Sequence, residues 1–407
     1  MKALAKALGI DPGTKSFDLV VIDNDRVIWE KSIDTIDIAR DPKVLIKAIE
    51  EAGNVDLIAG PSGYGTPIVC NEDIIDPYTF ALEILLLTSR EDIEEGMKRG
   101  EPGIAVYKAL ADTVAVLWEK KARVCYIPSV ILLPTVPSYR KINRIDMGTA
   151  DKMAIAVLGV FDQSRRLGIG YEETSFILIE MGYGYNAVLA VDQGKIIDGY
   201  GGTLVPTGFL TIGPIDAEAV VAGRSWSKSD VFYGGVSTIC NEYNVEKAIE
   251  KALKEDTCRD AFKNMYESIV KTVYAINKSL EKPREIILSG RLSRIPEIRE
   301  TIEELLGDIA PVTKIQGLPG AKISKEAAQG YAIVGEGIAH GFFHNLIKHM
   351  GIDKARGTVF DWLYHPRLLI AKKRLLNAYR KSIKTEILYR IIGSNQYNIA
   401  TGISVPR

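Results

Sequence analysis

The chain of 407 residues contains little cysteine and histidine, and it has no long apolar run. Its cysteines, Cys70, Cys125, Cys240 and Cys258, include no C-x-x-C pair, which argues against a zinc ribbon, a dithiol redox centre or a secreted disulfide framework. No window offers the uninterrupted apolar residues of a membrane span, and the first ten residues lack the features of a signal peptide. We therefore expect reduced thiols and a cytoplasmic location.

A strong charge of either sign is also absent. The chain carries 51 Lys and Arg against 52 Asp and Glu, so we expect neither a nucleic acid nor an anionic membrane as partner. Hydrophobic residues at 46% and charged residues at 25% are typical of a globular enzyme. Because 407 residues exceed what one hydrophobic core covers, we expect two domains and an appendage.

The first part of the chain predicts an α/β order that begins with a meander of three strands. Asp-Pro-Gly marks the first turn of this meander, and Asn-Asp marks the second. Helical stretches then alternate with two further apolar strands, and a helix ends this half. The predicted strands cover 3–10, 17–23, 26–34, 55–60 and 124–129, and the predicted helices cover 42–52, 77–99, 104–122 and 146–167.

The same order begins again near residue 175, with a second meander that also turns at glycines. The predicted strands are 176–181, 185–191, 195–198, 285–288 and 312–316, and the predicted helices are 216–223, 245–280, 296–306 and 324–340. This repetition indicates a structural duplication. We place one domain at 1–168, a second at 169–342 and a helical, basic extension at 343–407.

The first predicted turn has the residues of a phosphate-binding loop. Gly13 lets the backbone approach an anion closely, and the N–H groups of Thr14, Lys15 and Ser16 can point at phosphate oxygens. Asp11 is placed to hold Mg²⁺ through water. A plain hairpin turn is the alternative, because Asp-Pro-Gly is common turn chemistry.

Two more glycine sites follow buried strands of the second half. One occupies the corner equivalent to the first turn, so the two corners could grip a polyphosphate from both sides. The other leaves room beside a strand end for adenine and ribose. A glycine hairpin explains each site alone, whereas three sites in this order favour nucleotide binding. The residues assigned to these two sites are Gly182, Tyr183, Gly184, Ser289, Gly290 and Arg291.

The three sites resemble the phosphate-1, phosphate-2 and adenosine motifs of the superfamily of acetate and sugar kinases, Hsp70 and actin. The stretches 194–202 (GKIIDGYGG) and 326–330 (EAAQG) are similar to segments of butyrate kinases, and the chain looks closest to an archaeal group of predicted butyrate kinase-like proteins. The resemblance implies duplicated ribonuclease H-like (actin-like ATPase) domains, each a mixed five-stranded sheet with flanking helices. It also implies that these domains close over ATP and Mg²⁺.

The chain departs from this pattern where acid kinases carry their chemistry. Glu180 begins the second loop, where the superfamily usually has Asp or, in acid kinases, His; we assign it with Asp11 to the metal. All four histidines lie after residue 339, so the histidine motif of acid kinases is missing. The segment 207–216, similar to their arginine segment, contains no arginine. The acceptor can therefore be a carboxylate or a hydroxyl group.

The nearest counterpart of the missing histidine motif is the segment before the long helix of the first half. A hydroxyl kinase needs a carboxylate to accept the proton and cations to neutralise the phosphoryl group, so we assign Asp151 as base and Lys152 as cation. A helix cap is the alternative reading. The basic residues just upstream, which suit an acidic substrate or a solvated loop, are Arg140, Lys141 and Arg144.

Two features near the C-terminus need interpretation. His340 and His344 have the spacing of a metal-binding pair, but few acidic residues and no cysteine lie nearby, so we interpret them as surface residues. Residues 367–390 hold eight basic residues against one acidic residue, which predicts a basic amphipathic helix. Binding to RNA or a membrane surface is one explanation. We prefer packing on the body of the protein or on the second subunit of a homodimer.

These observations lead to three competing functions. The first is an ATP-dependent kinase for a small-molecule acceptor. The second is a nucleotide-dependent switch or scaffold that hydrolyses ATP slowly. A carbamoyl-transfer enzyme that modifies tRNA ranks last, because such enzymes carry a metal-binding His-x-x-x-His in the first half and this chain does not.

Overall fold

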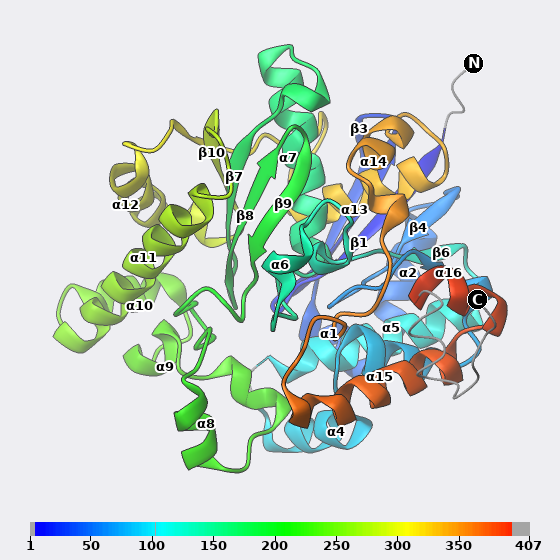
Figure 1. Cartoon of the computed structure of the whole chain (residues 1–407), viewed down its shortest axis with the longest axis horizontal. Helices are drawn as coiled ribbons and strands as arrows, with labels where there is room; N and C mark the ends of the chain where they lie inside the picture. Colours follow the sequence, from blue (N-terminus) through cyan, green and yellow to red (C-terminus); the bar gives the residue numbers. More distant parts are fainter. Residues whose placement is uncertain (1–4, 102, 393–407) are drawn as a thin grey trace.

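The computed structural model describes residues 5–101 and 103–392, which form an α/β fold with two mixed sheets (Figure 1). The parts of the predicted first strand and of the C-terminal extension at 3–4 and 393–407 lie outside the described residues. The strands are β1 (Lys6–Pro12), β2 (Ser16–Asp23), β3 (Arg26–Asp34), β4 (Leu57–Ala59), β5 (Val69–Cys70), β6 (Val124–Tyr126), β7 (Phe176–Met181), β8 (Asn186–Asp192), β9 (Lys195–Tyr200), β10 (Glu285–Ser289) and β11 (Val312–Lys314).

The two sheets share one arrangement of strands. The first has the order β3-β2-β1-β4-β6-β5, and the second has the order β9-β8-β7-β10-β11 when it is read from its other edge. In each, the first three strands along the chain are antiparallel, and two later strands lie in parallel beside the first: β4 and β6 in the first sheet, β10 and β11 in the second. The first sheet also has β5, which pairs antiparallel with β6 at its edge. Both predicted meanders are therefore confirmed. The expectation of five strands in each sheet is right for the second sheet and wrong for the first, because β5 adds a sixth strand beside β6. Strands β2 and β7 are almost continuously buried, as expected where helices cover both faces of a sheet.

The α-helices lie on the faces of these sheets and around their edges. They are α1 (Thr35–Arg40), α2 (Lys43–Glu51), α3 (Pro77–Thr79), α4 (Arg90–Arg99), α5 (Ile104–Glu119), α6 (Ser138–Lys141), α7 (Ala150–Leu167), α8 (Ala217–Gly223), α9 (Val236–Cys240), α10 (Val245–Ala252), α11 (Asp256–Asn277), α12 (Pro296–Leu306), α13 (Glu326–Ile338), α14 (His344–His349), α15 (Leu369–Ser382) and α16 (Thr385–Ile392). Two shorter elements matter below: the π-helical turn η2 (Phe80–Leu85) and the 3₁₀ turn η5 (Lys228–Phe232).

Three predicted helices are broken in the structure. The helix expected at 77–99 divides into α3, η2 and α4, because Ser89 starts a new helix through a capping box with Asp92. The helix expected at 245–280 divides into α10 and α11, which pack against each other. The basic helix expected at 367–390 divides into α15 and α16. At that break Ile383 is extended and forms a β-bridge with Ile74.

Helices α7 and α13 join the two halves of the chain. The first-half helix α7 packs against β7 and β8, and α13 packs against β1, β2 and β4 of the first sheet. Glycines permit these contacts: a Cβ at Gly9 would lie 2.3 Å from the carbonyl oxygen of Ala328, and one at Gly330 would lie 2.1 Å from that of Ala154. The two helices also pack on each other, and their N-termini lie next to the same cavity.

The C-terminal elements pack on the first half. The buried side chains of α15, among them Leu375, Leu376 and Tyr379, lie against α3 and η2, and the hydroxyl groups of Tyr379 and Thr66 are 3.2 Å apart. Packing on the body of the protein is therefore confirmed for this helix. Its basic residues Lys373 and Arg374 are exposed.

The cysteines are not reduced as predicted. Cys70 pairs with Cys125 across the neighbouring strands β5 and β6, and Cys240 pairs with Cys258 between α9 and α11. The prediction was wrong because the absence of C-x-x-C excludes only local pairs, whereas these partners lie 55 and 18 positions apart. Among the described residues, no helix is long and apolar enough to cross a membrane.

Candidate active site

A cavity of about 170 Å³ opens where β1, β7 and β10 end and where α7 and α13 begin. The N-terminal turn of each helix contributes to the wall, through Asp151 and Lys152 of α7 and through Glu326 and Ala327 of α13. Unpaired N–H groups and the helix dipole make such a position favourable for an anion. Two helix N-termini at one cavity therefore suit a polyphosphate.

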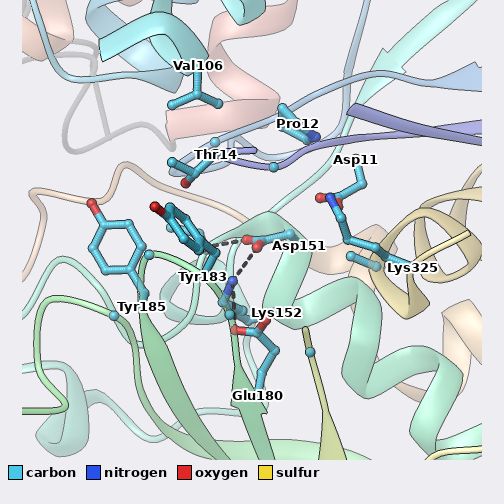
Figure 2. Close-up of a pocket in the computed structure, with 18 of the residues that line it drawn as sticks. Asp11, Pro12, Thr14, Val106, Asp151, Lys152, Glu180, Tyr183, Tyr185 and Lys325 are labelled. Carbon is cyan, nitrogen blue, oxygen red and sulfur yellow. Dashed lines mark hydrogen bonds and ion pairs between the residues drawn. The ribbon is translucent and has the colours of Figure 1, made fainter. Parts of the chain in front are cut away.

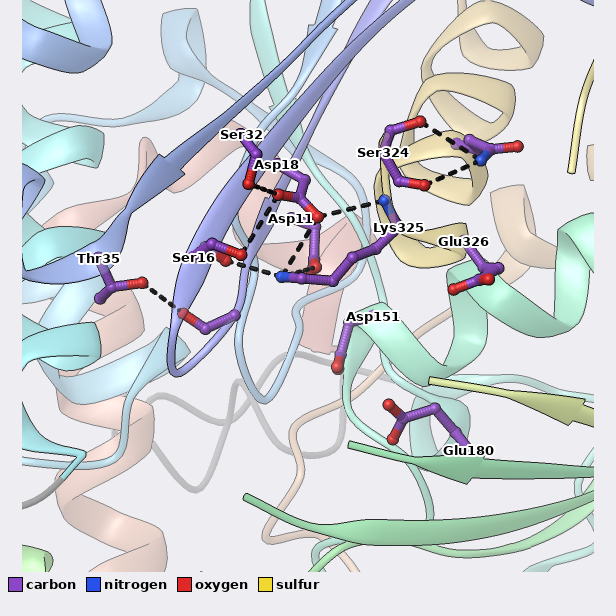
Figure 3. A network of polar contacts seen from close by, with 12 residues as sticks. Asp11, Ser16, Asp18, Ser32, Thr35, Asp151, Glu180, Ser324, Lys325 and Glu326 are labelled. Atoms are coloured by element: carbon purple, nitrogen blue, oxygen red, sulfur yellow. Dashed lines mark hydrogen bonds and ion pairs between the residues drawn. The ribbon is translucent and has the colours of Figure 1, made fainter. Parts of the chain in front are cut away.

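The first wall is the predicted phosphate loop after β1. Asp11 to Lys15 line the cavity, whereas Ser16 is buried behind them and donates to the carboxylate of Asp18. The hydroxyl of Thr35 donates to the carbonyl oxygen of Gly13 at 2.7 Å, which holds the loop in place (Figure 3). Burial raises the pKa of Asp11 to about 6, although the nearby Lys325 ammonium acts in the opposite direction.

The second wall combines the other two glycine sites. A Cβ at Gly184 would lie 3.3 Å from the hydroxyl oxygen of Thr14, so the two predicted phosphate loops face each other closely. Gly290 has φ +93°, and a Cβ there would lie 2.4 Å from the carbonyl oxygen of Met181. Gly182, Tyr183, Gly184, Gly290 and Arg291 line the cavity; Ser289 is buried beneath them.

Asp151, Lys152 and Glu180 form a cluster between these walls. Lys152 contacts a carboxylate oxygen of Asp151, and its Nζ lies 3.1 Å from Oε2 of Glu180 (Figure 2). Thr149 caps α7 without a side-chain hydrogen bond to the helix backbone, and its hydroxyl donates to Asp151 at 2.5 Å. Asp151 therefore lines the cavity and does not act as the helix cap.

Burial and the charge of Lys152 leave the pKa values of Glu180 and Asp151 shifted in opposite directions. Burial raises the pKa of Glu180 to about 7, against the effect of Lys152. The pKa of Asp151 lies below its ordinary value, because the charge of Lys152 and hydrogen bonds from Lys152 and Thr149 outweigh its burial. Asp151 is thus ionised at neutral pH, whereas Glu180 is close to its titration midpoint.

Lys325 is a site residue that sequence reasoning missed. It precedes α13, and its ammonium lies 3.3 Å from Oδ2 of Asp11, 3.4 Å from Oδ2 of Asp18 and 2.7 Å from the carbonyl oxygen of Ser16 (Figure 3). A Cβ at Gly13 would meet this ammonium at 2.4 Å. The sequence feature that could have identified Lys325 as a site residue is its position directly before the EAAQG stretch.

The far end of the cavity is apolar and aromatic, which the sequence did not indicate. Tyr107 and Phe232 have ring centroids 5.6 Å apart, and Tyr185 and Phe232 have centroids 6.0 Å apart. Tyr64, Leu85, Leu86, Val106 and Leu110 complete this end. The residues come from five separated segments of the chain, so no local motif marks them.

Several sequence candidates lie elsewhere. The three basic residues before α7 serve contacts within the protein: Arg140 and Arg144 each lie 3.8 Å from a carboxylate oxygen of Asp198, and Lys141 donates to the carbonyl oxygen of Leu133 at 2.8 Å. His344 uses Nδ1 in a contact with the carbonyl oxygen of Gly337. In the part of the chain that the structure describes, no group of three His, Cys, Asp or Glu could hold a metal ion.

Known structures share this fold. The chain is similar to a propionate kinase from Francisella tularensis, with 12% identity over 81% of this chain and 98% of that one and a TM-score of 0.53. It is also similar to the acetate kinase of Porphyromonas gingivalis, with 16% identity over 81% and 97% of the two chains and a TM-score of 0.51. A ROK family glucokinase from Streptomyces griseus matches with 14% identity over 81% of this chain and 99% of that one, with a TM-score of 0.44.

At such identities the similarities to the propionate kinase and the acetate kinase show the fold and not the reaction. No curated protein matches the sequence. A family model does match, over residues 9–365, and it spans both sheets and the whole cavity wall. The chain therefore belongs to the family described as Protein of unknown function (DUF1464).

Proposed function

We propose that this protein is an ATP- and Mg²⁺-dependent kinase that transfers the γ-phosphoryl group to a carboxylate or hydroxyl group of a small molecule, in the manner of butyrate kinases. The observation that carries the proposal is the meeting of the two glycine loops, at Thr14 and Gly184, beside the Asp151, Lys152 and Glu180 cluster. The loops would hold the phosphates, and Gly290 and Arg291 would flank the adenosine.

The charged residues fit the needs of such a transfer. Mg²⁺ commonly takes one or two carboxylates together with phosphate oxygens and water, so Asp11 and Glu180 suffice without a third protein ligand. Bound there, the ion would neutralise charge on the phosphates. Lys152 and Lys325 add positive charge on two sides of the cavity. The ionised Asp151 would orient the acceptor and receive its proton late in the transfer.

The proposal includes the wider organisation of the chain. We propose that domains 1–168 and 169–342 are duplicated ribonuclease H-like units, because their sheets share order and direction. The extension from 343 packs on the first unit through α15. A cytoplasmic location and a homodimer stay parts of the proposal that need their own measurements.

Calorimetric titration with a non-hydrolysable ATP analogue and Mg²⁺ tests the nucleotide site. We expect binding by the wild type and at least about tenfold weaker binding by Asp11→Ala, a loss of about 1.4 kcal/mol. The exposed Asp37→Ala is the matched control. Unchanged affinity in Asp11→Ala would remove Asp11 from the site, and the absence of any binding would refute the kinase.

The runner-up function, a nucleotide-dependent switch, would use the same loops. The enclosed aromatic end of the cavity favours the kinase, because a switch needs no second pocket beside the phosphates. If the protein forms and releases ADP slowly, and no small-molecule acceptor accelerates this reaction, the switch is the correct function.

A further inference from the structure

The aromatic end of the cavity lies away from Asp11 and Lys325, on the side of Thr14 and Val106. In Figure 2, Asp151 lies between Asp11 and Lys325 on one side and Tyr185 on the other. Tyr64, Tyr107, Tyr185 and Phe232 enclose this end, which we call the aromatic chamber. A molecule in the aromatic chamber would have one end at Asp151 and the other end against the tyrosines.

Lys228 lies behind this chamber, at the start of η5. Its ammonium is 4.9 Å from the ring centroid of Tyr64 and 5.3 Å from that of Tyr107. Burial lowers the pKa of Lys228 to about 8, and the carboxylates that act against this effect are Asp146 and Asp92. Lys228 as a whole residue is half-buried, and the cavity wall next to its ammonium is formed by Tyr64 and Tyr107.

No carboxylate of the described residues forms an ion pair with Lys228, in contrast to Lys152 and Lys325 of the cavity wall. Lys152 pairs with Asp151 and Glu180, and Lys325 pairs with Asp11. Two aromatic faces compensate an enclosed ammonium only in part. A cation in such surroundings favours an anionic partner that enters with a ligand.

Asp146 does not supply that partner. One of its carboxylate oxygens accepts from the backbone N–H of Gly148 at 3.1 Å. The other accepts from the backbone N–H of Thr203 at 3.0 Å and from its hydroxyl at 3.1 Å. These bonds tie the loop before α7 to the loop after β9 and leave Lys228 without a paired carboxylate.

We propose that Lys228 binds an anionic group of the acceptor, and that the acceptor is a hydroxy acid whose hydroxyl lies at Asp151 and whose apolar body fills the aromatic chamber. The inference rests on the proposed kinase function. It assigns the negative charge to the end of the acceptor that does not react. A simple carboxylic acid would have to place its only polar group at both ends.

Each bond and proton of the proposed transfer can be followed. The acceptor oxygen forms a bond to the γ-phosphorus while the bond from this phosphorus to the β–γ bridging oxygen breaks, and ADP leaves with that electron pair. The hydroxyl proton passes to the Asp151 carboxylate and from there to water. Lys228 takes no part in these bonds; it selects and positions the acceptor.

Matched sets of acceptors test the inference. One set is 4-hydroxybutyrate, butyrate and 1-butanol; the other is 4-(hydroxymethyl)benzoate, benzoate and benzyl alcohol. ADP formation is measured with the full chain, ATP and Mg²⁺. We expect kcat/KM for a hydroxy acid to exceed that for its matched alcohol and its matched acid by at least about tenfold.

Variants assign this preference to Lys228. Lys228→Met should raise KM for the hydroxy acid at least about tenfold, with kcat much less affected, and should lower the ratio of kcat/KM for the hydroxy acid to kcat/KM for the alcohol by a similar factor. Lys228→Arg should keep most of the preference, since the charge remains. Lys98→Met, exposed on the adjacent helix α4, is the control and should behave as wild type.

The outcomes separate this inference from the kinase proposal. Turnover of every hydroxy acid below that of its alcohol, no turnover of any hydroxy acid, or an unchanged KM in Lys228→Met would overturn the role of Lys228 while nucleotide binding stands. Failure to bind the ATP analogue with Mg²⁺ would remove both proposals. The retained preference in Lys228→Arg, together with its loss in Lys228→Met, would support the inference.

Discussion

The ammonium of Lys325 lies 3.3 Å from a carboxylate oxygen of Asp11, across 314 positions of sequence. Asp11 is 5% exposed in its side chain and Lys325 is 21% exposed, so the pair is mostly shielded from water. The contact joins the end of β1 to the start of α13. It places a protein cation at the point where we propose that the metal-bound phosphates lie.

Lys325→Met should destabilise the protein and weaken nucleotide binding together. The substitution keeps the side-chain length but leaves the buried Asp11 without its cation, for which we expect a loss of about 2 kcal/mol in the free energy of unfolding. Urea denaturation and calorimetric titration measure the two effects. Lys322→Met, at a nearby exposed position, should change neither. Stability and affinity equal to those of the wild type would show that the pair is unimportant.

Asp151→Asn should lower turnover at least about tenfold while ATP affinity changes less than about twofold, because an interaction made mainly in the transition state affects the rate. The matched control is Asp256→Asn, which alters a first-turn aspartate of α11 whose side chain is 89% exposed. Steady-state kinetics and nucleotide titration provide the comparison. Equal turnover in both variants would leave Asp151 with a structural role only.

Glu180 should make the stability of the nucleotide-free protein depend on pH. Its pKa is raised from 4.5 to about 7, so its contribution is fully present below about pH 4.5 and is lost as the pH rises through about 7. The free energy of unfolding of the wild type minus that of Glu180→Gln should therefore fall between pH 4.5 and pH 7.5. Denaturation series at both ends of this range measure it. A difference that rises with pH would contradict the raised pKa.

Tyr379→Ala should destabilise the first half of the molecule, because the side chain is 1% exposed and contacts Thr66 through its hydroxyl. Truncating a buried aromatic residue typically costs about 3–5 kcal/mol. Thermal and urea unfolding measure the loss, and Tyr364→Ala, 64% exposed, is the control. If the two variants unfold alike, α15 is a dispensable addition to the core.

The local pattern of the sequence was sufficient for most elements of the fold. Apolar runs bounded by Asp-Pro-Gly, Asn-Asp and glycine turns predicted both meanders, and β3, β7 and α12 have the predicted bounds. Strands and turns of this kind are decided by the residues within them and next to them. The same holds for the loops at Gly13, Gly182 and Gly290, which were identified as candidates from their place after buried strands.

Tertiary structure decided what pairs across long distances. The break at Ile383 depends on a bridge to Ile74, the Cys70–Cys125 disulfide depends on the adjacency of β5 and β6, and the aromatic chamber draws on side chains from residue 64 to residue 232. Sequence patterns describe neighbours along the chain. The partners of Lys325 and the surroundings of Lys228 exist only after the two sheets have packed with the helices α7 and α13 that join them. Burial and charge act through space and not along the sequence.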